Sequence, residues 1–216
     1  MLDYQREFIE FAIEKNVLCF GEFTLKSGRK SPYFFNSAFF SDGDSLLKLG
    51  KFYAHAIKQS KLKFDLVYGP AYKGIPLASA VAIAYGLEYD IALPYCFNRK
   101  EEKDHGEGGV TLGAPLKDRR VLIVDDVISA GTSVNQSVAI IRNAMAHPVG
   151  VTVALDRQER GLDDISAIQE VEQKYGLRVL SIISLDNLVE YLQAQGGQTD
   201  DLERIQEYRN QYGIGG

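Results

Sequence analysis

The chain has 216 residues, of which 45% are hydrophobic and 25% are charged, and its formal net charge is −5. That length fits one α/β domain with a substantial core, and the ordinary composition excludes a disordered or low-complexity chain. The excess of acidic residues argues against nonspecific binding to nucleic acid or to an anionic membrane. The longest apolar run, 74–87, is shorter than the roughly 20 residues that a membrane span needs. We therefore expect a soluble, cytoplasmic protein without a nucleic-acid or membrane partner.

The N-terminal segment predicts an amphipathic helix followed by a hairpin. Residues 3–15 place apolar side chains on one helical face, and a strand-like segment follows at 17–25. A polar turn that begins at Lys26 then leads into an aromatic strand containing Phe34 and Phe35. The segment can be a hairpin with a packed edge. Alternatively, Lys26 can offer its charge to a phosphate while the two rings offer their faces to a flat heterocycle. The residues by themselves leave both interpretations open.

The next elements are a helix at 41–59, with Asp42 or Asp44 near its start, and a short strand after Phe64 that ends in a tight turn rich in Gly and Pro. Lys73 lies at the tip of that turn, where the following helix begins. A lysine at a helix N-terminus is unfavourable against the helix dipole unless an anion lies between them. This position therefore favours a phosphate ligand.

A predicted strand at 91–97 gives way to residues 98–115, which have several glycines and no apolar face. A long segment without secondary structure is usually an active-site lid or a disordered insertion. The lid is favoured because basic residues concentrate there in an acidic protein, which suits a pyrophosphate; they are Arg99, Lys100, Lys103 and His105. A solvated run of charges is the alternative, because acidic residues are interleaved with the basic ones.

The most informative stretch runs from Val121 to Ser133. Its first four residues are aliphatic, which predicts a strand buried on both faces of a parallel sheet. Asp125 and Asp126 follow, where such sheets bind ligands, and adjacent carboxylates repel unless hydroxyl groups or a cation lie beside them. Small and hydroxylated residues then lead into a helix that is expected to bury Val134, Val138, Ile141 and Met145. Because a helix N-terminus and its preceding turn can bind phosphate, the stretch predicts a pocket for a ribose and its phosphate, with simple helix capping as the alternative.

The C-terminal part continues the alternation of strands and helices. A buried strand at 148–155 ends near Arg157, whose guanidinium suits a substrate carboxylate, and elements follow at 165–175, 178–183, 184–193 and 199–212. This alternation predicts an α/β fold with a doubly wound parallel sheet. Cys19 and Cys96 are far apart in the sequence and are expected to be core thiols, not parts of a disulfide or a zinc site.

The run from Val121 to Ser133 resembles the binding signature of type I phosphoribosyltransferases for 5-phosphoribosyl 1-pyrophosphate (PRPP). Together with the Lys26 segment and the stretches 71–76, 99–109 and 156–161, it makes nearly the whole chain resemble the orotate phosphoribosyltransferase family. The resemblance implies a single domain over 1–216 with a mostly parallel sheet flanked by helices. It also implies a small N-terminal hood, made of residues 1–40 and part of the C-terminal region, and a mobile catalytic loop at 98–115.

The resemblance also implies roles for individual residues. PRPP would be bound by Lys26, Tyr72, Lys73, Arg99, Lys100, Lys103, His105, Asp125, Asp126, Val127, Ile128, Ser129, Ala130, Gly131, Thr132 and Ser133. Orotate would be bound by Lys26, Phe34, Phe35, Ser129 and Arg157. The residues expected to contribute to catalysis are Lys103, Asp125, Asp126, Arg99 and His105. The cofactor Mg²⁺ would be held mainly through PRPP, with Asp125 as a candidate ligand. The family usually has threonine where Ser129 stands, so a hydroxyl group is retained.

The implied activity is Mg²⁺-dependent transfer of the phosphoribosyl group from PRPP to orotate in pyrimidine biosynthesis, giving orotidine 5′-phosphate and pyrophosphate. The resemblance further implies a homodimer whose two active sites are shared between subunits. Two alternatives stay open: a type I enzyme that accepts another base, and a PRPP-sensing regulator that binds nucleic acid. The acidic composition counts against the regulator.

Overall fold

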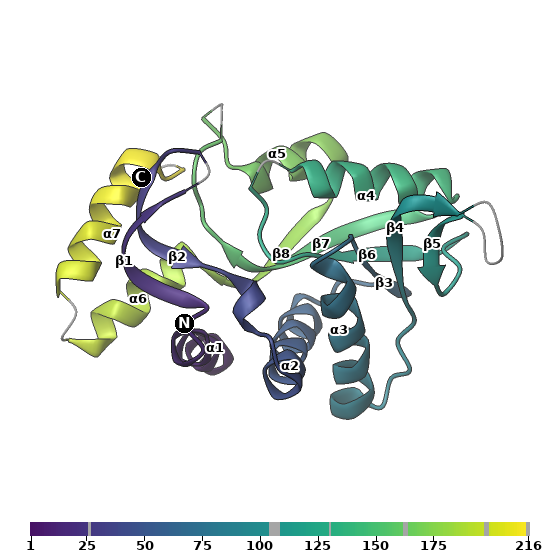
Figure 1. Cartoon of the computed structure of the whole chain (residues 1–216), viewed down its shortest axis with the longest axis horizontal. Coiled ribbons are helices and arrows are strands. Elements are labelled where there is room, and N and C mark those ends of the chain that lie inside the picture. The colour runs from purple at the N-terminus through teal and green to yellow at the C-terminus, as the bar shows by residue number, and fades with distance from the viewer. Residues whose placement is uncertain (26, 104–108, 130, 162–163, 197–198, 215–216) are drawn as a thin grey trace.

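The computed structural model describes residues 1–25, 27–103, 109–129, 131–161, 164–196 and 199–214 (Figure 1). The first half of the chain forms α1 (Asp3–Glu14), β1 (Leu18–Thr24), β2 (Lys30–Phe35), the 3-10 turn η1 (Ser37–Phe39), α2 (Gly43–Ser60), β3 (Leu66–Gly69), α3 (Gly74–Tyr89) and β4 (Tyr95–Lys103). The second half forms β5 (Gly109–Gly113), β6 (Arg120–Val124), α4 (Thr132–Asn143), β7 (His147–Asp156), α5 (Ala167–Tyr175), β8 (Arg178–Ser184), α6 (Leu185–Gln195) and α7 (Thr199–Tyr212).

The centre of the molecule is a six-stranded sheet in the order β5-β4-β3-β6-β7-β8. Neighbouring strands pair in parallel from β4 to β8, and only β5 pairs antiparallel, at the edge. Helices α4 and α5 cover one face of the sheet, while α2 and α3 lie on the other (Figure 1). The predicted doubly wound, mostly parallel α/β fold is confirmed.

The run of four aliphatic residues in β6 is buried on both faces of the sheet, as predicted. Residues Val121 to Val124 are fully buried, and they contribute to both hydrophobic clusters of the core. Val121 and Ile123 pack with α4 and α5, whereas Leu122 and Val124 belong to the cluster on the α2 and α3 side. A strand covered on both faces must be apolar at every position, which explains why apolar and polar residues do not alternate along β6.

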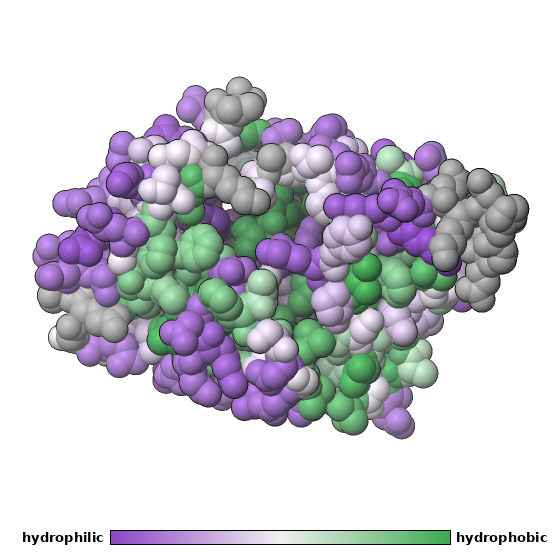
Figure 2. Space-filling model, in the orientation of Figure 1, coloured by the Kyte–Doolittle hydropathy of each residue, from purple (hydrophilic) through white to green (hydrophobic). Residues whose placement is uncertain are grey.

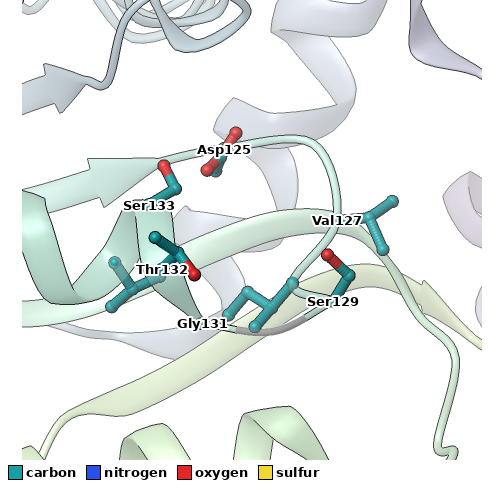
Figure 3. A pocket seen from close by; sticks show the side chains of 8 residues that line it. Asp125, Val127, Ser129, Gly131, Thr132 and Ser133 are labelled. Atoms are coloured by element: carbon teal, nitrogen blue, oxygen red, sulfur yellow. The ribbon is translucent and has the colours of Figure 1, made fainter. Parts of the chain in front are cut away.

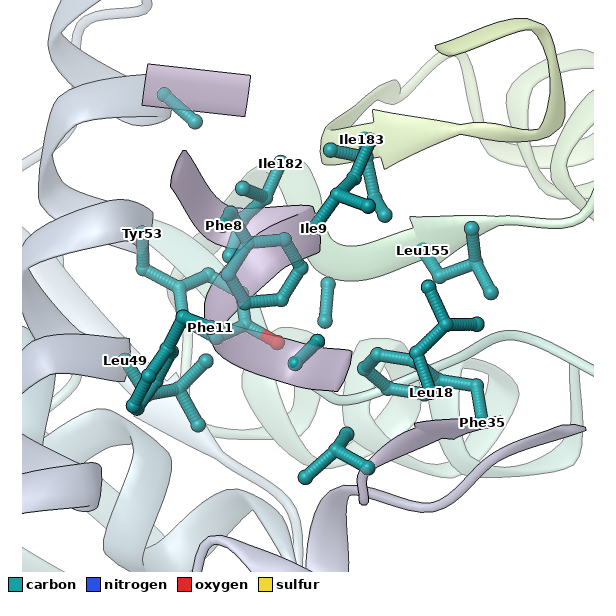
Figure 4. Close-up of a cluster of buried hydrophobic side chains, with 14 of the residues drawn as sticks. Phe8, Ile9, Phe11, Leu18, Phe35, Leu49, Tyr53, Leu155, Ile182 and Ile183 are labelled. Atoms are coloured by element: carbon teal, nitrogen blue, oxygen red, sulfur yellow. The ribbon is translucent and has the colours of Figure 1, made fainter. Parts of the chain in front are cut away.

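A second layer of apolar side chains joins the hood to the sheet. Phe8 and Phe11 of α1 pack with Phe35, Leu49 and the sheet residues Ile182 and Ile183 in one continuous cluster (Figure 4). The antiparallel β1–β2 hairpin lies beside α7, as Figure 1 shows. This arrangement brings the N-terminal hairpin and the C-terminal helix together, and the hood as a separate subdomain stays a prediction.

Several predicted boundaries were wrong for identifiable reasons. Residues 98–115 do not lack secondary structure, because Tyr95–Lys103 and Gly109–Gly113 pair as an antiparallel hairpin. The strand predicted at 91–97 accordingly begins at Tyr95 and runs on past 97. Met145 lies beyond the end of α4 with a left-handed backbone and a 62% exposed side chain, so it is not a core residue. Cys96 is buried as predicted, but Cys19 is only partly buried.

No helix in the described part of the chain has the length and apolarity to cross a membrane. The cytoplasmic location stays a prediction.

Helices α2 and α3 pack closely because Gly50 has no side chain. A Cβ atom added to Gly50 would lie 2.5 Å from the carbonyl oxygen of Ala80 in α3, whereas one added to Gly43, in the same helix, would meet nothing within 4 Å. We predict that Gly50→Ala lowers the free energy of unfolding by about 1–3 kcal/mol, because the two helices must move apart. Gly43→Ala is the matched control and should leave it unchanged or raise it by up to about 1 kcal/mol. Urea unfolding of both variants checks this, and equal stabilities would contradict it.

Candidate functional site

The carboxyl ends of β3, β6 and β7 meet at one edge of the sheet, where parallel α/β proteins bind ligands. The loop after β3 carries Tyr72 and Lys73, the loop after β6 carries Asp125 and Asp126, and the loop after β7 carries Arg157. Three segments that are distant in the sequence are therefore brought together as predicted. The hairpin β1–β2 approaches the same edge from the hood.

The β6–α4 loop encloses a cavity of about 230 Å³. Hydroxyl groups and a carboxylate line it, and Figure 3 shows them distributed around the loop that joins β6 to α4. The lining residues are Asp125, Val127, Ile128, Ser129, Gly131, Thr132, Ser133 and Val134. Gly131, which precedes α4, has a left-handed backbone with φ of 67°, a conformation that glycine adopts without strain. A turn of this shape at a helix N-terminus is suited to a phosphate group.

Asp125 is a buried carboxylate, with only 7% of its surface exposed. Burial, and then the neighbouring charge of Asp126, raise the pKa of Asp125 to about 6. Its Oδ1 accepts a hydrogen bond from the backbone N–H of Asp126 at 2.9 Å, and its backbone carbonyl accepts one from the buried Tyr53 hydroxyl at 2.7 Å. The acid is therefore held rigidly in a site where its own charge is unfavourable.

Asp126 has two partners from other parts of the chain. Lys73 Nζ and Ser37 Oγ each donate to Asp126 Oδ2 at 2.7 Å. The anion beside Lys73 in the structure is thus a carboxylate of the protein, and the phosphate ligand expected at Lys73 stays a prediction. Ser37 and Tyr53 were missed by sequence reasoning, since a single serine or tyrosine carries no pattern; the position of Ser37 directly after the aromatic strand was the one available signal.

Two glycines fix the path of the β3–α3 turn that carries Tyr72 and Lys73. A Cβ atom on Gly69 would overlap the carbonyl oxygen of Gly74, and one on Gly74 would overlap the ring of Pro70. The backbone N–H of Ala71 also donates to the Asn98 side chain at 2.8 Å, which ties the turn to β4.

Lys100 of β4 places its ammonium group 4.5 Å from the centre of the Tyr72 ring. That ring is 68% exposed. The contact brings β4, in which Arg99 also lies, alongside the β3–α3 turn. Basic residues of β4 and of the β3–α3 turn therefore stand at the same edge of the site.

On the hood side, the Arg157 guanidinium is surrounded by polar and aromatic groups. Its Nε donates to Glu159 Oε1 at 2.7 Å, its Nη2 donates to Ser31 Oγ at 3.2 Å, and its carbon lies 4.3 Å from the centre of the Tyr33 ring. Sequence reasoning missed Glu159, Ser31 and Tyr33. The sequence Asp156 to Gly161 could have suggested Glu159, which stands two residues after Arg157.

The two aromatic residues of β2 point in different directions, because successive side chains of a strand alternate. Phe34 is partly exposed and stacks on Phe23 at 5.5 Å, so one of its faces is covered. Phe35 is buried in the core, where it packs near Phe8. A contribution of Phe35 to ligand binding would therefore come from its backbone.

Three other predicted site residues lie outside the described residues: Lys26, His105 and Ala130. Lys103 is the last residue of β4.

The burial of Asp125 predicts a pH-dependent stability. Its pKa is higher in the folded chain than its ordinary value of 3.8, so its contribution is fully present below that value and is lost as pH rises through about 6. Asp125→Asn should therefore be more stable than the parent at pH 8, on the order of 2 kcal/mol, and should lose that advantage near pH 4. Urea unfolding at both pH values measures it. Asp164→Asn, at a fully exposed carboxylate, is the control and should not change the pH profile. If Asp125→Asn gave the same gain in stability at both pH values, this account would be contradicted.

Comparisons with known proteins agree with this geometry. Residues 40–178 match the model of the phosphoribosyl transferase domain family. A relative from Thioalkalivibrio sulfidiphilus named orotate phosphoribosyltransferase is 59% identical over 214 residues, which cover 99% of this chain and 100% of the relative. A Vibrio cholerae protein of the same name is 56% identical over the same coverage.

Among solved structures, the orotate phosphoribosyltransferase of Francisella tularensis is 41% identical, with a TM-score of 0.88. The superposition covers 96% of this chain and 99% of that one. The identity extends over the hood and the C-terminal helices, which lie outside the matched domain. The chain therefore belongs to the orotate phosphoribosyltransferase family.

Proposed function

We propose that the protein transfers the phosphoribosyl group of PRPP to orotate, producing orotidine 5′-phosphate and pyrophosphate. The observation that carries this function is the β6–α4 segment, where two adjacent carboxylates stand beside a hydroxyl-lined cavity at a helix N-terminus. A ribose 5-phosphate fits this chemistry, because the acids accept hydrogen bonds from ribose hydroxyls and the loop N–H groups bind phosphate oxygens. The names of the family relatives support the same donor and acceptor.

In the reaction, the bond between C1′ of the ribose and a pyrophosphate oxygen breaks, and a bond forms between C1′ and a ring nitrogen of orotate. That nitrogen gives up its proton, which water or the departing pyrophosphate accepts. The pyrophosphate keeps the bonding electrons, so positive charge develops on the ribose ring. No side chain has to act as a nucleophile. The protein contributes by positioning the reactants and by stabilising the developing charges. Asp125 and Asp126 would orient the ribose and lie near the positive charge, while the basic side chains of β4 would face the pyrophosphate.

Binding of PRPP would change the partners of Lys73. In the structure Lys73 and Asp126 form an ion pair at 2.7 Å, although more than half of the Lys73 side chain is exposed. A ribose hydroxyl can take the place of the ammonium group at Asp126, and a phosphate oxygen can take the place of the carboxylate at Lys73. The ion pair would keep both groups ready and neutralise them until the donor arrives.

The residues of the site are suited to a magnesium ion held largely by the substrate. Within the described residues no group of three or more acidic, histidine or cysteine side chains could hold a metal ion. Mg²⁺ prefers oxygen ligands and retains several waters, so Asp125 can supply one ligand while PRPP supplies others. When bound, the ion would neutralise charge on the departing pyrophosphate.

The acceptor half of the site would lie between the hood and the β7 loop. Arg157 can pair with the carboxylate that distinguishes orotate from uracil, and the exposed face of Phe34 can contact the flat ring. Ser129 stands at the boundary with the phosphate cavity and can offer its hydroxyl group to the base. Lys26 and the backbone of Phe35 would complete this half.

The activity is tested by the spectrophotometric loss of orotate. We predict consumption only when PRPP and Mg²⁺ are both present, with uracil a much poorer acceptor. Arg157→Ala should raise the KM for orotate by about 10-fold or more, since a charge-assisted hydrogen bond is lost, and should change the KM for PRPP far less. Equal turnover of uracil and orotate by the parent protein, or an unchanged orotate KM in the variant, would refute the role of Arg157.

We further propose that the protein works as a homodimer through an apolar surface on α3 and the segment before β4. Ile83, Leu87, Ile91 and Tyr95 are each more than a third exposed there, and an adjoining groove of about 500 Å³ is lined almost entirely by apolar residues. Figure 2 shows this surface as a green area over α3. Exposed apolar patches of this kind mark interaction surfaces, and a two-fold dimer would bury the same patch on both subunits. Tyr95 and Gly113, at the base of the β4–β5 hairpin, line the groove, so the dimer contact would include the start of this hairpin. The family resemblance implies that the segment between the two strands acts on the partner's site.

A subunit-mixing experiment tests the shared sites. If the loop closes over the partner's site, Lys103→Ala and Asp126→Ala homodimers should each be nearly inactive. After subunit exchange, half of the dimers are hybrids, and each hybrid has one intact site and one site with both defects. The mixture should therefore recover about a quarter of the parent activity. No recovery, with exchange verified by mass, would show that the loop acts on its own subunit.

A further inference from the structure

Glu159 lies in the part of the site where the acceptor base is proposed to bind, and no role has been given to it so far. Its side chain is 13% exposed and stands between two arginines. Arg157 Nη2 lies 2.6 Å from Glu159 Oε1. Arg29, in the turn between β1 and β2, places its Nη1 3.9 Å from Glu159 Oε2. Tyr33 also donates its hydroxyl to Glu159 at 3.3 Å. The carboxylate is thus the centre of a cluster that joins the β7 loop to the hood.

The Arg157–Glu159 pair uses one edge of the guanidinium group. Glu159 Oε1 lies 2.7 Å from Nε and 2.6 Å from Nη2, so the carboxylate occupies the side edge of the guanidinium plane. Ser31 Oγ accepts from Nη2 at 3.2 Å. The end of the plane that bears Nη1 and Nη2 is the edge to which a second carboxylate can bind in the bidentate manner typical of arginine. A weak neutral acceptor such as Ser31 can be replaced there.

The charge of the cluster matches one bound carboxylate. Two guanidinium groups and one carboxylate give a net charge of +1. Burial raises the pKa of Tyr33 well above its ordinary value, so this phenol adds no charge at neutral pH. A single Arg–Glu pair would be neutral and would offer no net attraction to an anionic base entering a poorly hydrated site. Arg29 therefore restores the positive charge that Glu159 removes from Arg157.

The backbone holds Glu159 in place from the other side. It forms an isolated antiparallel bridge with Gly213, directly after α7. Arg160 N–H donates to the Tyr212 carbonyl at 2.8 Å, and Ile214 N–H donates to the Gln158 carbonyl at 3.0 Å. Arg29 also donates to the Arg160 carbonyl at 2.9 Å. The side chain that orients Arg157 is therefore fixed independently of any ligand.

We propose that Glu159 is a positioning residue for recognition of the acceptor: it holds the side edge of Arg157 so that the end of the guanidinium meets the carboxylate of the base. This inference rests on the proposed orotate-dependent activity. Loss of Glu159 should weaken binding of the acceptor and leave the affinity for PRPP and the rate of the chemical step nearly unchanged. Arg29 contributes through Glu159 and through the net charge of the cluster.

Glu159→Gln is the informative variant, because it keeps the size of the side chain and one acceptor oxygen but removes the charge. We expect its KM for orotate to rise by about 3- to 10-fold, with kcat and the KM for PRPP within about 2-fold of the parent. Glu159→Ala should raise the orotate KM further, so that glutamine acts as a partial rescue. Asp164→Asn is the matched control, since that carboxylate also pairs with an arginine of the same loop, at 3.9 Å, but is fully exposed. It should change none of these constants.

The possible outcomes separate three explanations. A lower orotate KM in Glu159→Gln would show that Glu159 competes with the base for Arg157, and would overturn the proposal. An unchanged orotate KM would also overturn it. A lower kcat together with higher KM values for both substrates and a lower melting temperature would overturn it as well, because that result would show a general structural role. If the parent protein consumes no orotate with PRPP and Mg²⁺, the proposed function itself has failed, which is distinct from either result.

Discussion

The pair of adjacent carboxylates at the end of a fully buried strand is the constraint on which the rest of the site depends. Removing Asp125 from water costs free energy, and placing Asp126 beside it adds repulsion. Lys73 from the β3–α3 turn and Ser37 from the segment after β2 offset part of this cost by donating to Asp126, while the Tyr53 hydroxyl from α2 holds the backbone carbonyl of Asp125. Each of these contacts also fixes the position of an element relative to β6. The acids that a ligand would use therefore also organise the site before a ligand binds.

Much of the fold could be predicted because its signals are local. An aliphatic run such as Val121–Val124 is characteristic of a strand buried on both faces, and the small residues after it mark the turn into α4. The β4–β5 hairpin was missed for a physical reason. Strand β5 lies at the edge of the sheet, and the pairing of β4 with β3 ends at Phe97. The rest of β4 is held by backbone hydrogen bonds to β5, so it needs no apolar face and its charged side chains resemble those of a loop. The extra exposure of Met145 likewise follows from where α4 ends, which periodicity alone does not fix.

The surroundings of the β6–α4 cavity and of Arg157, which are the proposed donor and acceptor halves of the site, differed in how far the sequence could predict them. The residues around the phosphate cavity are nearly contiguous, so their order alone indicated their chemistry. The environment of Arg157 depends on contacts with Ser31, 126 residues away in the chain, and with Glu159, whose role depends on the placement of Arg29. No local sequence pattern predicts contacts between residues so far apart in the chain. The alternation of β2 did imply that Phe34 and Phe35 face opposite sides, and burial decided which one faces the core.

The two halves of the site can also evolve separately. A donor site encoded by one strand, one loop and the start of one helix can be inherited as a unit, and selection acts on it as a single short stretch. The proposed acceptor site is assembled from the β1–β2 hairpin and the β7 loop, with the C-terminal helix behind them, so substitutions there can accumulate one at a time without altering the β6–α4 loop. A lineage can therefore change the base that it accepts while retaining its sugar-phosphate donor. Divergence between such lineages should be concentrated in the hood and in residues 156–161.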